Sequence, residues 1–232
     1  MEPLNLKKLN AERKARRAAI LVTEITEGRD RVIREGDVIG GALGEAVTKA
    51  FTSGKSGMVI ADGVEFFLNV HVPPPRIVVI GAVHISQALA PMAAIVGYDL
   101  EVIDPRTAFA TPERFGGVAL NAEWPEIILK NRPLDAYTAL VAVTHDPKID
   151  DFPIEAALAA GCFYIGALGS KKTHAKRRER LSALGISDVK LDSIKAPIGL
   201  NIGAASPAEI AVATLAQIID AFRNRALDGT LS

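Results

Sequence analysis

The chain has 232 residues, and its 27 lysine and arginine residues are balanced by 27 aspartate and glutamate residues. This balance leaves no basic excess for nucleic acid, and no apolar run reaches the roughly 18 residues that a membrane span needs. The single cysteine, Cys162, excludes a disulfide framework within the chain, so we expect a cytoplasmic protein without nucleic-acid or membrane partners.

The first 72 residues predict a small α+β domain. The expected elements are a helix from Pro3 to about Arg17, strands over 19–26 and 31–34, a helix from the glycine-rich segment 40–45 to about Ser53, and a hairpin of strands 58–61 and 64–72 around Asp62-Gly63. The glycines before the helix suit either an anion held on backbone N–H groups or tight packing of the helix. The sequence leaves these two readings open.

A run of three prolines, 73–75, follows this domain. Prolines fix φ and cannot continue a sheet ladder, so such a run is typical of a stiff spacer. We therefore place a domain boundary here, between residues 1–72 and residues 73–232.

The stretch after the prolines predicts the opening βαβ unit of a nucleotide-binding sheet. Residues 77–80 are apolar without alternation, as in a parallel strand that is covered on both faces. Gly81 allows a sharp turn into an alanine-rich helix, and a second apolar run then ends at Asp104.

The remaining elements alternate between strands and helices. They are strands over 117–120, 139–144 and 162–165, with helices over 124–130, 151–160 and 174–184, and a last helix that starts at Ser206-Pro207 and runs to about Ala226. This alternation predicts an α/β fold, a Rossmann-like and mostly parallel sheet with helices on both faces.

Ligands of such sheets bind beyond the carboxyl ends of the strands. The loops at those ends supply the candidate cofactor-binding residues Gly81, Ala82, Val83, His84 and Ile85; Asp104 and Arg106; Thr144 and His145; Gly169, Ser170 and Lys171; and, before the last helix, Gly199, Asn201 and Gly203. Asp104 is placed to accept hydrogen bonds from a sugar hydroxyl, and Ser170 with Lys171 suits a phosphate. The four histidines have no metal-ligand spacing, so we predict no metal site.

Two functions remain open from these residues alone, a nicotinamide-dependent oxidoreductase using NAD(P) and a nucleotide-binding module without catalysis. Val83 stands where the dinucleotide fingerprint has its second glycine, which counts against an ordinary NAD site. His145 and Asp146 suit acid–base chemistry, but nothing in the sequence gives them a partner, so we predict no catalytic residue. We expect Cys162 to be a small buried side chain inside a strand.

Three segments together resemble one family. They are residues 81–89 with Asp104-Pro105-Arg106, residues 166–174 (Gly-Ala-Leu-Gly-Ser-Lys-Lys-Thr-His), and residues 198–204 (Ile-Gly-Leu-Asn-Ile-Gly-Ala) with Pro207 and Glu209-Ile210-Ala211. The chain is similar, through these segments, to the xanthine dehydrogenase accessory proteins, the XdhC/CoxI family of molybdenum-cofactor maturation factors. The resemblance covers about residues 70–225.

The resemblance implies a helper protein that is not an enzyme. Such proteins bind the molybdenum cofactor, a pterin phosphate, while a cysteine desulfurase adds its terminal sulfur, and pass it to an apo molybdenum hydroxylase. The family's members are often homodimers. The family's usual Gly-Ala-Gly-His reads Gly81-Ala82-Val83-His84 here, and Ala42 and Leu43 stand where the N-terminal domain often has a cysteine.

Overall fold

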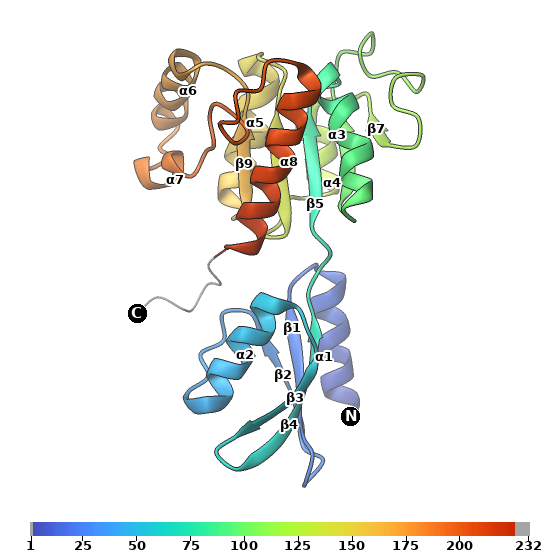
Figure 1. Ribbon diagram of the computed structural model, residues 1–232, viewed down its shortest axis with the longest axis vertical. Helices are drawn as coiled ribbons and strands as arrows, with labels where there is room; N and C mark the ends of the chain where they lie inside the picture. The colour runs from blue at the N-terminus through green and yellow to red at the C-terminus, as the bar shows by residue number, and fades with distance from the viewer. Residues whose placement is uncertain (1, 226–232) are drawn as a thin grey trace. The chain divides into compact units, whose positions relative to one another are not determined.

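The computed structural model describes residues 2–225 (Figure 1). The chain divides into two compact units, residues 2–73 and residues 74–224, which are described separately. Within the described residues, no helix combines the length and the apolar composition that crossing a bilayer requires.

The N-terminal unit is a four-stranded antiparallel sheet in the order β2-β1-β4-β3, with two helices packed on it. Its elements are α1 (Pro3–Lys14), β1 (Ala19–Glu24), β2 (Asp30–Arg34), α2 (Gly41–Ser53), β3 (Gly57–Ala61) and β4 (Val64–His71). Ala61 pairs with Val64, so Asp62 and Gly63 form the predicted turn between β3 and β4. This unit confirms the α+β prediction.

Gly44, in the glycine-rich start of α2, packs closely against the backbone before the helix. A Cβ atom on Gly44 would lie 1.9 Å from the carbonyl oxygen of Ile39, so no side chain fits there. Close backbone packing, one of the two readings left open by the sequence, therefore accounts for this glycine.

The second unit is a five-stranded sheet in which every pair of neighbouring strands is parallel. The strands are β5 (Arg76–Ile80), β6 (Asp99–Ile103), β7 (Ala119–Asn121), β8 (Thr138–Ala142) and β9 (Tyr164–Ala167), in the spatial order β7-β6-β5-β8-β9. This order is that of a Rossmann sheet, and it confirms the predicted fold class.

Helices cover both faces of this sheet, as Figure 1 shows. They are α3 (His84–Ile95) and α8 (Pro207–Arg223) on one face, α4 (Pro125–Asn131) and α5 (Pro147–Ala159) on the other, and α6 (Lys171–Ala183) with α7 (Asp188–Asp192) beside α5. Residues 77–80 and 139–142 are fully buried, because these central strands pack against helices on both sides. The predicted end of the last helix at Ala226 lies outside the described residues.

Two helices begin earlier than predicted, because their caps lie upstream of the expected starts. The α5 helix begins at Pro147 rather than at residue 151, since the Asp146 side chain accepts a hydrogen bond from the Lys148 N–H at 2.9 Å. The α6 helix begins at Lys171 rather than at residue 174, since the Ser170 hydroxyl accepts a hydrogen bond from the Thr173 N–H at 3.2 Å. Both starts combine a capping residue with a helix-compatible first turn.

The fifth strand begins two residues later than predicted. It starts at Tyr164, so Cys162 lies before the strand, half-buried against the apolar core, and Gly166 lies inside it. A Cβ on Gly166 would lie 2.7 Å from side-chain atoms of Ile198, so the segment before α8 packs closely on this strand. Burial raises the pKa of the Cys162 thiol to about 12.

Candidate functional site

The turn from β5 into α3 stands at the centre of the sheet's carboxyl edge, the upper edge of this unit in Figure 1. Gly81 has a φ of 122°, and the Ser86 hydroxyl donates a hydrogen bond to its carbonyl oxygen. A Cβ on Gly81 would lie 3.0 Å from Cγ2 of Thr144. The glycine therefore lets the ends of β5 and β8 meet, and it brings two predicted site residues together.

Asp104, at the end of β6, holds this turn in place. Its buried carboxylate accepts hydrogen bonds from the Ala82 N–H at 2.7 Å and from the Arg106 backbone N–H and guanidinium at 2.8–2.9 Å. Burial alone would raise the pKa of Asp104, but the hydrogen bonds from Arg106 and Ala82 outweigh it and lower the pKa. A sugar hydroxyl would reach this carboxylate only by displacing one of these internal bonds.

The first turn of α3 has no side-chain cap. Val83 occupies the N-cap position and makes no side-chain hydrogen bond, as is also the case at the starts of α1, α2, α4 and α7, whereas Asp146, Ser170 and Ser206 cap α5, α6 and α8. The N–H groups of a first turn lack partners inside the helix, and the dipole of the helix favours negative charge there. The exposed His84 is the first residue of this turn.

Arg114 is a residue near this turn that the sequence did not single out. It comes from the loop after β6, and its guanidinium donates to the carbonyl oxygen of Ala82 at 3.1 Å and to the side chain of Gln87 at 3.0 Å. Arg106 also lies beside the β5–α3 turn, but its charge is paired with that of Asp104. Arg114 was not recognisable as part of a site, because its loop has no regular pattern.

One predicted residue, His145, lines a cavity of about 230 Å³ between the first turns of α5 and α6, whereas the predicted residues Gly169, Ser170 and Lys171 do not line it. The cavity is lined by His145, Pro147, Asp150, Lys172, Thr173, Lys176, Arg177 and Arg180. Thr144 adjoins it, because its hydroxyl donates to the Asp150 carboxylate at 2.7 Å. The ends of β8 and β9 thus converge on one hollow, next to the β5–α3 turn.

The segment that carries Gly199, Asn201 and Gly203 does not line this hollow. The Gly199 N–H donates to the side chain of Gln217 in α8, and the Leu200 N–H donates to the carbonyl oxygen of Ala213. The segment leads to the start of α8, at the same end of the sheet (Figure 1). Asp104 and Ser170 follow the carboxyl ends of β6 and β9, but neither the cavity beside α6 nor the larger one described next is lined by Asp104, Ser170 or Asn201.

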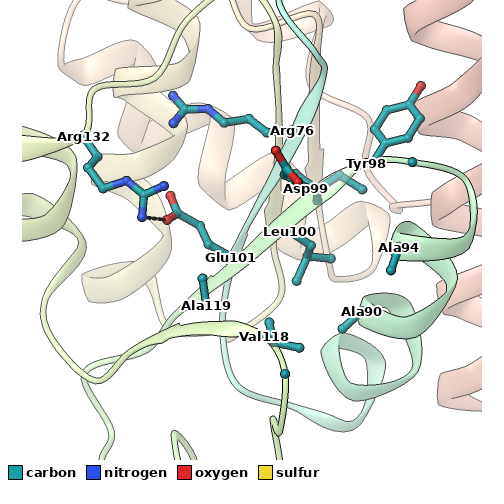
Figure 2. Close-up of a pocket in the computed structure, with 13 residues that line it drawn as sticks. Arg76, Ala90, Ala94, Tyr98, Asp99, Leu100, Glu101, Val118, Ala119 and Arg132 are labelled. Carbon is teal, nitrogen blue, oxygen red and sulfur yellow. Dashed lines mark ion pairs between the residues drawn. The ribbon is translucent and has the colours of Figure 1, made fainter.

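A larger cavity, of about 490 Å³, lies at the opposite end of the strands (Figure 2). It contains none of the predicted site residues, and its buried Glu101 forms an ion pair with Arg132 at 2.7 Å. Ligands of parallel α/β sheets bind at the carboxyl ends of the strands, so the site is placed at that edge. Within residues 2–225, no three histidine, cysteine, aspartate or glutamate side chains gather in a way that would hold a metal ion.

Sequence comparison assigns this unit to a family. The family model described as "XdhC Rossmann domain" matches residues 77–218, more than half of the chain. The chain belongs to the XdhC family. The match extends from β5 to within α8, so it includes every loop at the carboxyl edge of the sheet.

Three curated relatives of this XdhC-family chain are informative. It is 32% identical over 170 residues to the uncharacterized protein YqeB of Escherichia coli, in an alignment that covers 68% of this chain and 29% of the relative. It is 30% identical over 146 residues to the E. coli molybdenum cofactor insertion chaperone PaoD, covering 63% and 40%. A protein of Bacillus subtilis named as a probable subunit of xanthine dehydrogenase is 34% identical over 148 residues, covering 63% and 43%. The chain thus matches less than half the length of each relative.

A solved structure has the same fold. The crystal structure described as a xanthine dehydrogenase from Bacillus halodurans matches 96% of this XdhC-family chain and 65% of its own chain, with a TM-score of 0.63. At 23% identity this likeness concerns the fold alone.

Asp150→Asn is expected to change how stability depends on pH. Burial raises the pKa of Asp150 from 3.8 to about 6, so the folded chain binds more protons than the unfolded chain between these values. Stability of the wild type therefore falls as the pH rises through this window, by at most about 3 kcal/mol. Asparagine has no proton to lose, so the free energy of unfolding of the variant does not fall in this window. The stability of the variant relative to the wild type therefore rises through the window and is constant above it.

Urea unfolding followed by fluorescence of Trp124 measures this difference. Trp124 is the single tryptophan and lies in the Rossmann unit, so its signal follows that unit. Stability curves of wild type and variant that run parallel between about pH 4 and about pH 7 would contradict the raised pKa.

Proposed function

We propose that this protein binds molybdenum cofactor and assists its insertion into a hydroxylase of the xanthine dehydrogenase type. Support comes from membership of the XdhC family and from the similarity to a relative named as a molybdenum cofactor insertion chaperone. Because the chain spans only part of these relatives, their activities and partners are proposals for it. The proposed role is that of a helper rather than an enzyme.

The observation that carries this proposal is the uncapped first turn of α3 at the centre of the carboxyl edge. The cofactor has an anionic phosphate, and free N–H groups at a helix start are suited to an anion. Asp104 fixes the position of Ala82 in this turn and is itself paired with Arg106, so Arg114 supplies the positive charge beside the turn. These residues suit the phosphate group of the cofactor. The molybdenum itself would supply its chemistry in the hydroxylase that receives the cofactor.

A cysteine desulfurase is proposed as the source of the terminal sulfur. Cys162 is the single cysteine of the chain, and burial keeps its thiol protonated at neutral pH, whereas sulfur transfer needs a thiolate. In this proposal the chain holds the cofactor while the desulfurase delivers sulfur. A homodimer, as is common in the family, is the proposed assembly.

The second candidate is a protein that binds NAD(P), either as an oxidoreductase or as a module without catalysis. The Rossmann sheet favours it, but Val83 has a branched side chain where a pyrophosphate would approach the backbone, and Asp104 is engaged internally. Calorimetry with NADH and NADPH separates the candidates. Micromolar binding of NADH or NADPH would favour the NAD(P)-binding candidate.

The proposed function is tested by titrating the purified chain with molybdenum cofactor and following cofactor fluorescence. We expect saturable binding, and we expect the loaded chain to increase the activity of an apo-hydroxylase above that reached with free cofactor. A titration without saturation, together with no gain in hydroxylase activity, would refute the proposal. The same protein, not loaded with cofactor, is the control for the activation assay.

A further inference from the structure

Arg177 of α6 is an unusual arginine, because it is buried without enough partners. Its side chain is 2% exposed, and Nη2 donates to the carbonyl oxygen of Leu168 at 3.1 Å. Within the part of the chain that the structure describes, its Nε and Nη1 atoms have no hydrogen-bond partner. A buried guanidinium with unsatisfied donors is costly, so a ligand that accepts those bonds would stabilise it.

The cavity that Arg177 lines has an excess of positive charge. Arg180 is neutralised by a two-bond ion pair with Asp151, at 2.6 and 3.0 Å. Lys172, Lys176 and Arg177 then share the cavity with a single carboxylate, Asp150. Three cations around one carboxylate leave room for a further negative charge.

The rest of the lining adds little to the positive charge. Pro147 begins α5, and Lys172 and Thr173 belong to the first turn of α6, but Asp146 and Ser170 already cap these two helices. Asp150 is the single group opposed to an anion. Burial raises its pKa to about 6, so it is readily protonated, and a protonated carboxyl donates a hydrogen bond to a phosphate oxygen.

We propose that this cavity is a binding site for a phosphate or diphosphate group of a small molecule, with Arg177, Lys172 and Lys176 as its cationic contacts. The site is separate from the β5–α3 turn, although Thr144 lies between the two. Phosphate binding here does not depend on the proposed cofactor, so either conclusion can fail while the other stands.

The test is calorimetry of the full chain with inorganic phosphate, inorganic pyrophosphate and ADP at constant ionic strength. We expect pyrophosphate to bind, and the double variant Lys172→Ala/Lys176→Ala to bind at least about tenfold more weakly. These lysines are exposed, so their replacement leaves the fold intact. Arg177→Lys should also weaken binding, since an ammonium cannot place two donors as a guanidinium does.

Arg178→Ala is the matched control. It removes one positive charge from the same helix, but Arg178 pairs with Asp188 and Asp192 and does not line the cavity. Unchanged affinity in this control, with loss in the lysine variant, supports the site. ADP binding tighter than pyrophosphate would assign the phosphates to a nucleotide, and equal binding would assign recognition to the phosphates alone. Any one of three results overturns the proposal. They are no binding at millimolar pyrophosphate, wild-type affinity in the lysine variant, or a loss of affinity in Arg178→Ala equal to that in the lysine variant.

Discussion

Asp104→Ala is expected to lower the free energy of unfolding of the Rossmann unit by about 2–4 kcal/mol. The substitution leaves the Ala82 N–H and the Arg106 guanidinium without their shared acceptor at a fully buried position. The main cost is the Ala82 N–H, which stays buried without an acceptor, whereas the Arg106 side chain is 32% exposed and regains contact with water. The measurement is urea unfolding followed by Trp124 fluorescence.

Two variants make this test specific. Asp99→Ala removes an exposed carboxylate from the start of the same strand and is expected to change stability by less than about 0.5 kcal/mol. Asp104→Asn keeps an acceptor for the Ala82 N–H but loses the charge, so its effect should fall between the two alanine variants. Equal stabilities for Asp104→Ala and Asp99→Ala would show that Asp104 does not hold the turn.

Gly81→Ala is expected to destabilise the same unit by about 3 kcal/mol or more, since it combines backbone strain with crowding. Gly81 has a φ of 122°, and the new Cβ would lie 3.0 Å from Cγ2 of Thr144 and 3.3 Å from its backbone nitrogen. Gly97→Ala is the control. Gly97 also has a positive φ, of 79°, but no atom within 4 Å of an added Cβ, so this variant measures strain alone.

Crowding can be separated from strain by a second substitution. Thr144→Ser removes Cγ2 while keeping the hydroxyl that bonds Asp150. We expect it to restore part of the stability lost in Gly81→Ala, as measured in a double-mutant cycle. Strictly additive changes in the free energy of unfolding would mean that there is no steric conflict between the ends of β5 and β8 in Gly81→Ala.

The fold was predictable because its strongest signals are local. The unbroken apolar run at 77–80, the glycine after it and the alternation of strands and helices each depend on neighbouring residues alone. The predicted starts of α5 and α6 were wrong because their capping residues, Asp146 and Ser170, are equally typical of loops. Nothing in the sequence indicated α7, a helix of five residues between two loops.

The site was less predictable, because it depends on which side chains the packing buries. The sequence predicted a helix over residues 174–184, and Lys172 and Lys176, four residues apart, are both exposed in the structure. Arg177 lies next to Lys176 in the sequence, but only the packing of α6 on α5 buries it. The role of Asp104 was likewise hidden, because one of its partners, the Ala82 N–H, lies at the end of another strand.

A charge placed at the first residue of α3 tests most directly whether the β5–α3 turn receives the phosphate of the cofactor. His84→Glu puts a negative charge in a first helical turn, which favours the helix itself, so stability should not fall. We predict that this variant binds molybdenum cofactor at least about tenfold more weakly than wild type, while His84→Gln, of similar size and without charge, retains most of the affinity. Equal affinities for wild type, His84→Glu and His84→Gln would contradict the account.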